Sequence, residues 1–297
     1  MMLLNTFEIL AIVFKGLMYL SVAAVIGGSL MLCLTRADPA EARFIRAYIG
    51  FGAVLGLVAI SLNYLALVGS FAEQGFWGMF DAQMQAFLWD SSVGEAVRWR
   101  VSGFILALVA SLLCMSKITV SRGVAYGVLG LSGSLLAFSF SVIGHSTELA
   151  PWAQALIVMH LVAIASWVGS LYPLWRMCDE SEPVLLTRVM HRFGQLGMAI
   201  VALVLFSGSG LLWLLFDHVA AFVDSPYGLA ISVKLSLVVV LFGIAASHKW
   251  RLSPQLSQGV AARAKLKHSI GIELGIVFLI LTVTGVLSSV LGPVSLQ

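Results

Sequence analysis

The sequence is poor in charged residues, and this shortage narrows the class of protein it can encode. Charged residues make up only 10% of the 297 residues, whereas hydrophobic residues make up 60% and the mean hydropathy is +1.01. A typical soluble domain carries about 25% charged residues. The composition therefore excludes an ordinary soluble protein and indicates a chain that resides in a membrane.

Cysteine is also scarce, with three residues in the whole chain. Cys33, Cys114 and Cys178 are far apart in the sequence, and each falls at the basic end of an apolar stretch or in a basic connector. Connectors of that kind face the reducing cytoplasm. We therefore expect free, partly buried thiols rather than a disulfide or a metal relay.

Eight apolar stretches are long enough to cross the hydrocarbon core, which takes about 20 helical residues. Proline is limited to seven residues, mostly in connectors, while many of the 28 glycines lie inside the stretches, as membrane helices tolerate. We predict an all-α polytopic membrane protein with eight transmembrane helices. The predicted spans are 7–34, 47–70, 98–116, 123–145, 151–175, 193–216, 229–248 and 269–291.

Basic residues are concentrated in alternate connectors, and this asymmetry orients the chain. Thirteen of the 17 Lys and Arg residues lie on one side, and the opposite connectors are mainly acidic. Because basic connectors stay in the cytoplasm, we expect both termini in the periplasm of a bacterial inner membrane, an N-out, C-out topology. The N-terminus has no basic n-region, so we expect it to begin the first span. The net charge of +3 then reflects topology, and we expect no nucleic-acid partner.

The two halves of the chain share short sequence patterns. MYLSVAAVIGGSL from Met18 matches MHLVAIASWVGSL from Met159, and SSVGEAVRWRV from Ser91 matches SPYGLAISVKL from Ser225. Two matches in the correct order predict two parallel four-helix repeats, residues 1–146 and 147–297. Transporters built in this way tend to bind their cargo between the halves.

Distinctive chemistry falls in the second half of this predicted repeat. His160 is matched by Tyr19, Trp167 by Ile26, and Lys234 by Arg100. The second half therefore carries the distinctive chemistry.

Two histidines are the strongest candidate metal ligands. His145 lies at the outer mouth of the fourth span, and His160 lies about 14 Å below the outer end of the fifth. A short connector joins these spans as an antiparallel hairpin, so both imidazoles can lie along one seam. Imidazole suits copper, zinc, nickel and haem iron. An interhelical hydrogen bond from His160 to a Ser or Thr is the structural alternative.

Other candidate ligands lie near the outer face. His218 and Asp217 form an exposed interfacial pair or a capture site. Methionine thioethers are soft ligands for Cu(I), but Met159 points about 100° away from His160 around the helix. Met79 and Met84 lie in an aromatic, acidic stretch that we predict to be an amphipathic interfacial helix.

Ionisable residues inside the spans are further candidates, because charge at membrane depth is costly. Lys234 lies in the outer half of the seventh span, and we expect an ion pair that holds this span against a neighbouring helix. Release of a proton from this lysine as Cu(I) arrives is the alternative. Glu273 lies near the inner end of the eighth span. Its simplest partner is Lys267 or Arg263, and a role at an inner gate is the alternative. The remaining histidines lie among cytoplasmic basic residues, and we expect interfacial side chains without a role: His191, His248 and His268.

Four segments from residue 144 onward resemble the copper resistance protein D family. They are GHS at 144–146, HLVAIASWVGSLYPLW from His160, SPYGLAISVKL from Ser225 and IELGIVFLILTVTGVLSS from Ile272. The first half is similar to that family's N-terminal spans, so the resemblance covers most of the chain. Its most specific residues are His160, Trp167 and Gly169, supported by Tyr227, Gly228, Lys234 and Glu273.

The resemblance implies an eight-span inner-membrane protein that moves copper into the cytoplasm, a transporter rather than an enzyme, with His145 and His160 as the metal-linked positions. The transported cargo would be copper ion, and the protein would be surrounded by membrane lipid. Family members commonly act with a periplasmic copper-binding protein of the cupredoxin-like C type. We recognise no such domain in the sequence and expect that partner to be a separate chain.

A haem-binding membrane oxidoreductase of the cytochrome b type is the alternative function. Its axial ligands would be histidines, and its propionates would be held by basic residues in the outer halves of the spans. Against it, His145 and His160 are about 14 Å apart along the membrane normal, whereas a bis-histidine haem needs two at one depth. The basic residues in question are Lys15, Arg98, Arg100 and Lys234.

Overall fold

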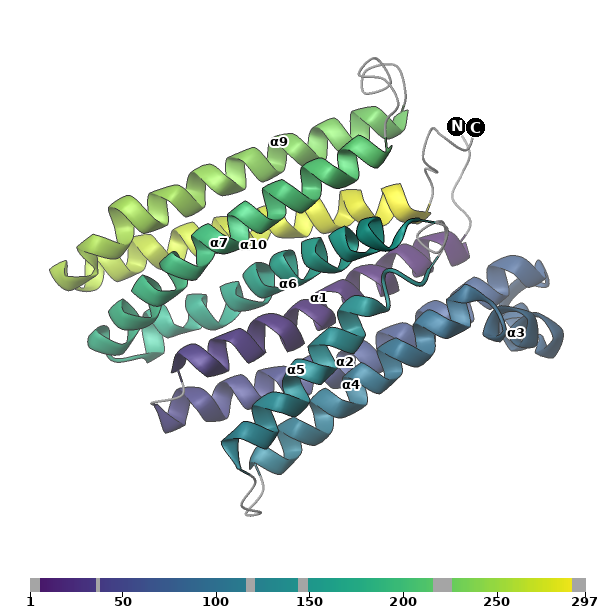
Figure 1. Ribbon diagram of the computed structural model, residues 1–297, viewed down its shortest axis with the longest axis horizontal. Helices are drawn as coiled ribbons and strands as arrows, with labels where there is room; N and C mark the ends of the chain where they lie inside the picture. Colours follow the sequence, from purple (N-terminus) through teal and green to yellow (C-terminus); the bar gives the residue numbers. More distant parts are fainter. Residues whose placement is uncertain (1–5, 36–37, 116–120, 144–148, 216–225, 290–297) are drawn as a thin grey trace.

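A computed structural model describes residues 6–35, 38–115, 121–143, 149–215 and 226–289. Within these ranges all regular structure is helical, and the long helices pack side by side into one elongated bundle (Figure 1). The predicted all-α class is therefore confirmed.

Seven helices in the described ranges are long and apolar enough to cross a membrane. The protein is thus a multi-pass membrane protein. Each of the seven covers most of a predicted span and several extend beyond it, since helices continue into the polar connectors. They are α1 (Thr6–Thr35), α2 (Pro39–Ala72), α4 (Ser92–Met115), α6 (Pro151–Glu180), α7 (Pro183–Leu215), α9 (Pro226–Ser247) and α10 (Val260–Ser289).

The predicted fourth span, 123–145, corresponds to the shorter apolar helix α5 (Arg122–Phe138). Its 17 residues cover about 25 Å, less than the hydrocarbon core requires. The predicted outer end of this span lies outside the described residues. The count of eight transmembrane helices therefore stays a prediction.

Helix starts follow from local chemistry. The carboxylate of Asp38 accepts hydrogen bonds of 2.9 Å from the backbone N–H groups of Ala40 and Glu41, and Pro39 opens α2. A capping carboxylate satisfies donors that have no intrahelical partner, and proline fits the first helical position because it lacks an N–H group. Pro151 opens α6 in the same way.

The predicted interfacial helix around Met79 and Met84 forms two shorter pieces. A 3₁₀ helix η1 (Gly75–Phe80) and the helix α3 (Ala82–Trp89) meet at Asp81, whose side chain caps α3. The break arises because an aspartate that accepts from the N–H of Met84 starts a new helix. Large aromatic rings remain exposed here, including Trp77 at 76%, which fits a segment at the membrane surface.

Figure 1 shows α1 and α6 side by side in the middle of the bundle, with α2, α4 and α5 beyond α1 and α7, α9 and α10 beyond α6. The predicted halves thus lie on opposite sides of the α1–α6 contact. The packing within the two sides differs, however: α2 packs along α4, whereas two cavities lie between α7 and α9. The parallel repeat and the boundary at residue 146 stay predictions.

The central contact between α1 and α6 depends on small residues. A Cβ atom placed on Gly27 would lie 2.5 Å from the Gly169 Cα atom, and one placed on Gly169 would overlap the Ala23 carbonyl oxygen. The Tyr48 hydroxyl donates a 3.1 Å hydrogen bond to the Gly169 carbonyl. Small residues four apart let membrane helices approach closely, so that backbone contacts replace side-chain contacts.

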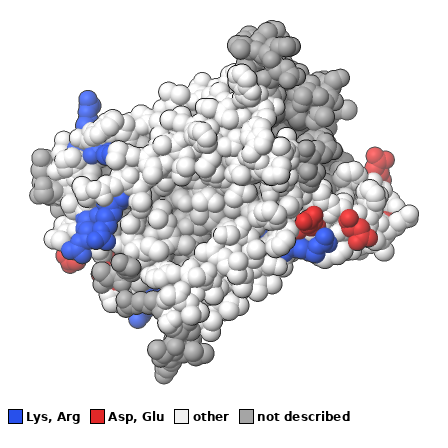
Figure 2. Space-filling model, in the orientation of Figure 1, with Lys and Arg blue, Asp and Glu red and all other residues white. Residues whose placement is uncertain are grey.

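Charge separates along the bundle, as the predicted topology requires. Figure 2 shows basic residues gathered near the end where α6 meets α7, and acidic residues near the end that carries α3. At the basic end, Arg176 pairs with the buried Glu41 at 3.1 Å. Arg263 donates to the carbonyl oxygens of Cys178 and Ser181, at 2.9 and 2.8 Å. These contacts tie α2, α6 and α10 together.

We predict that Gly169→Ala destabilises the fold, because the added methyl group has no room at the α1–α6 crossing. Overpacking of this kind costs about 1–3 kcal/mol. Thermal unfolding in detergent should show a lower Tm than Gly243→Ala, where a Cβ meets nothing within 4 Å. Equal melting temperatures for the two variants would contradict the close crossing.

Candidate functional site

Two cavities lie one above the other between α6, α7, α9 and α10. The outer cavity has a volume of about 350 Å³ and the inner cavity, nearer the basic end, about 420 Å³. Trp167 of α6 and Phe242 of α9 line both cavities, and their rings stack with centroids 5.6 Å apart. The stacked rings form the boundary between the two cavities.

The outer cavity holds His160, Tyr227 and Lys234 among mainly aliphatic side chains. Among the described residues, none that lines it carries a carboxylate, thiol or thioether. The predicted ion pair of Lys234 is not found within the described residues. Lys234 instead lies with His160 on the wall of one cavity.

His160 forms a hydrogen bond to α7. Its Nδ1 atom lies 3.0 Å from the Ser207 hydroxyl, which also contacts the Leu203 carbonyl oxygen. When Ser207 donates to Leu203, its oxygen accepts from Nδ1, and Nε2 then keeps its lone pair. The interhelical hydrogen bond considered from the sequence thus exists, and it leaves one ring nitrogen able to bind a metal.

The ring of His160 fits closely against α7. A Cβ atom on Gly208 would lie 3.2 Å from the His160 Cε1 atom. The absence of a side chain at Gly208 therefore leaves room for the imidazole at the cavity wall.

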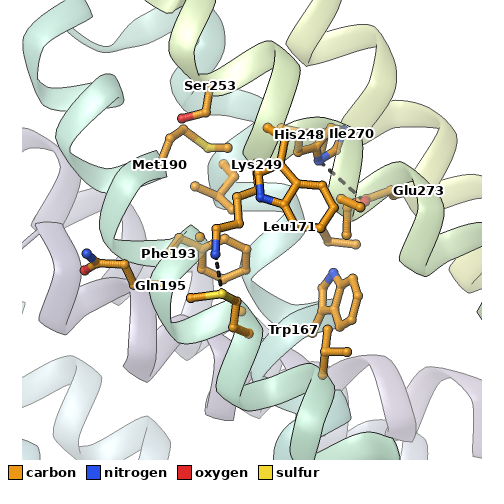
Figure 3. Close-up of a pocket in the computed structure, with 18 of the residues that line it drawn as sticks. Trp167, Leu171, Met190, Phe193, Gln195, His248, Lys249, Ser253, Ile270 and Glu273 are labelled. Atoms are coloured by element: carbon orange, nitrogen blue, oxygen red, sulfur yellow. Dashed lines mark hydrogen bonds and ion pairs between the residues drawn. The ribbon is translucent and has the colours of Figure 1, made fainter.

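The inner cavity holds a second polar group, shown in Figure 3. His248 and Glu273 point toward one another, with Nδ1 and Oε1 3.5 Å apart, and Nε2 of His248 lies 2.7 Å from the Ser269 hydroxyl. Both residues are buried, Glu273 at 1% exposure and His248 at 8%. Lys249 lines the same cavity and contacts the Met198 sulfur.

Two expectations from the sequence are wrong here. Glu273 does not pair with Lys267 or Arg263, because Lys267 pairs with Asp179 and Arg263 binds backbone carbonyls at the α6 terminus. His248 is not an interfacial side chain. The helical path continues past α9 through a π-helical turn (η3, His248–Leu252), so His248 packs against α10 rather than facing water.

The other predicted residues are spread over the molecule. Trp167 lies between the cavities, but Met159, Met79 and Met84 line neither of them. His145, Asp217 and His218 fall outside the described residues. Within the described ranges, no three His, Cys, Asp or Glu side chains come together as a metal-binding group. His160 is thus the single predicted metal ligand whose surroundings are defined.

The matched positions in the first half form a filled site. Arg100 lies with its guanidinium carbon 4.8 Å from the Phe140 ring centroid and donates to Ser139 at 3.1 Å. The rings of Tyr19 and Phe140 lie 5.7 Å apart. Aromatic rings and a guanidinium thus pack together where the second half has a cavity.

This geometry gives no support to the haem alternative. Arg100 is occupied by Ser139 and Phe140, and Arg98 donates to the Trp89 carbonyl at 3.0 Å. Both nitrogens of His248 face protein groups. Among the described residues, the outer cavity contains one histidine, so the paired axial ligands of a bis-histidine haem are not present there.

Comparisons with known proteins agree with the resemblance seen in the sequence. The chain is 28% identical over 144 residues to copper resistance protein D of Pseudomonas syringae pv. tomato, covering 44% of this chain and 46% of that protein. It is 25% identical over 183 residues to copper transport protein CutJ of Bacillus subtilis, covering 57% of this chain and 33% of that protein. The chain thus spans less than half the length of these relatives. No solved structure matches it.

Two family patterns cover most of the chain. The pattern described as copper resistance protein D-like, N-terminal domain, matches residues 6–155, half of the sequence. The pattern described as copper resistance protein D matches residues 187–287, which include most of α7, all of α9 and Glu273. Both α7 and α9 line the two cavities. The protein therefore belongs to the copper resistance protein D family.

Proposed function

We propose that the protein transports copper across the bacterial inner membrane, from the periplasm to the cytoplasm, with His160 as an intramembrane ligand. Membership of a family named for copper resistance, and the copper transport protein among the relatives, support the choice of cargo. The proposal describes binding and passage of an ion, so the protein acts as a transporter and not as an enzyme.

One observation carries the proposal: His160 lines the outer cavity, and its Nδ1 atom contacts the Ser207 hydroxyl, so Nε2 is the proposed ligand atom. Residues that hold the second nitrogen of a ligating histidine orient the ring and raise its basicity. Neutral imidazole is a suitable ligand for copper. A single protein nitrogen also binds weakly enough for release, which transport needs.

The route follows the two cavities. Copper captured at the outer face, where the sequence places His145, would enter the outer cavity and bind His160. It would then pass the stacked rings of Trp167 and Phe242 to reach the inner cavity. A cation is attracted to the face of an aromatic ring, so this boundary favours passage of a positive ion over that of an anion.

Lys234 has an electrostatic role in this proposal. A protonated amine has no lone pair, so it cannot bind copper while it carries charge. It lines the same cavity as His160, and none of the described residues that line this cavity is a carboxylate. A positive charge there weakens the binding of any cation, copper included, which favours release over retention.

The proposed surroundings follow the sequence prediction. Both termini lie in the periplasm, and a separate periplasmic copper-binding protein of the cupredoxin-like C type supplies the ion. The segregation of basic residues toward one end of the bundle supports this orientation.

We predict that His160→Ala abolishes copper uptake into proteoliposomes, and that Ser207→Ala weakens Cu(I) affinity by about 10–100-fold because the imidazole loses its orienting partner. Ser236→Ala is the matched control, since this exposed serine bonds only to the Ser232 carbonyl of its own helix. Competition titration with a Cu(I) chelator measures the affinities. Full uptake by His160→Ala would place the ligand elsewhere.

We also predict the sidedness of two segments. A reporter enzyme active only in the periplasm should be inactive when inserted in η4 (Ser253–Gln258) and active when inserted after Gln74. The reason is the excess of basic residues beside η4 and of acidic residues beside Gln74. The reverse pattern of activity would invert the topology and the proposed direction.

A further inference from the structure

The carboxylate of Glu273 lacks the partners that a buried charge requires. It is 1% exposed, and its Oε1 atom accepts no hydrogen bond. Its neighbour, His248 Nδ1, lies 3.5 Å away, beyond the usual length of a hydrogen bond. Removing a carboxylate from water without full compensation is strongly unfavourable.

The depth of Glu273 in the bundle increases the free-energy cost of burying its charge. Glu273 lies six residues beyond Lys267 along α10, which is about 9 Å further into the bundle. An ionisable side chain at membrane depth is expensive and marks a pathway for ions or protons unless it is paired. No Lys or Arg pairs with Glu273 among the described residues.

Other titratable groups around the inner cavity contact side chains other than His248 and Glu273. His191 of α7 lies 3.2 Å from the Gln195 side chain, and Lys249 of the π-helical turn contacts Met198. The residues that α6 contributes to the cavity do not titrate: Trp167, Leu171 and Leu174. His248 and Glu273 are therefore the two groups able to share a proton there.

The chemistry of the pair favours a proton over the proposed cargo. Cu(I) prefers soft sulfur ligands, whereas a carboxylate is a hard ligand. A proton needs only one acceptor, the Glu273 carboxylate, and His248 Nδ1 lies 3.5 Å away as a second partner.

We propose that His248 and Glu273 form a proton-binding site that exchanges with the cytoplasm through the inner cavity. A proton from cavity water binds the Glu273 carboxylate and gives a neutral acid that donates toward His248 Nδ1. Deprotonation returns the proton to the same water. The site stands on the geometry of the inner cavity, while its coupling to copper rests on the proposed function.

Infrared difference spectroscopy of the full chain in lipid nanodiscs tests the site. Wild-type protein should show the carbonyl stretching band of a protonated carboxyl group, and this band should decline as pH rises. Glu273→Gln should lose the band and keep its melting temperature, because a neutral amide replaces a neutral acid of the same shape. Glu182→Gln, at an exposed carboxylate near the same end of the bundle, should retain it. An unchanged band in Glu273→Gln, or no titrating band in wild-type protein, would overturn the proposal.

Proteoliposomes that contain a pH-sensitive dye test the coupling. Copper uptake by wild-type protein should be accompanied by proton movement, and Glu273→Gln should lose that copper-linked signal. Copper uptake without proton movement would leave the proton site intact and exclude its coupling. If wild-type protein moves no copper, the proposed function fails, and the infrared titration still decides whether Glu273 binds a proton.

Discussion

The close approach of α1 and α6 is the constraint on which the rest of the structure depends. Backbone meets backbone at Gly27 and Gly169, and the Tyr48 hydroxyl reaches the Gly169 carbonyl across the same contact. Lipid tails are as apolar as leucine side chains, so helices in a membrane associate through such close packing. The contact fixes α6, and with it the height of Trp167 and His160 in the bundle.

The polar residues at matched positions on the two sides of this contact have different surroundings. In the first half, Arg100 packs against Phe140 and bonds to Ser139, so the polar group is enclosed. In the second half, Lys234 and His160 line a cavity. A side chain packed on all sides, such as Arg100, fits a structural role, whereas a side chain that lines a cavity, such as His160, can contact a bound ion. This difference supports our proposal that the binding site lies in the second half.

Interhelical contacts of single residues determine the two polar sites. The Ser207 hydroxyl contacts Nδ1 of His160. The π-helical turn places His248 beside the Glu273 carboxylate. Trp167 and Phe242 separate the sites. An outer imidazole and an inner carboxylate–imidazole pair are divided by two rings. In the functions that we propose, a cargo ion and a proton would bind at these different depths.

The amino-acid sequence by itself determined the helical class, seven of the spans and the candidate status of His160, Trp167, Lys234 and Glu273. Apolar length and intramembrane polarity depend on residue type alone. Only the tertiary structure decided the partners. Ser207 is 47 residues from His160, and the pairing of His248 with Glu273 replaced the expected Lys267 or Arg263 because helix rotation and a π-helical turn set which side chains meet. Hydropathy and charge patterns describe the depth of a residue, whereas its contacts depend on how neighbouring helices are rotated.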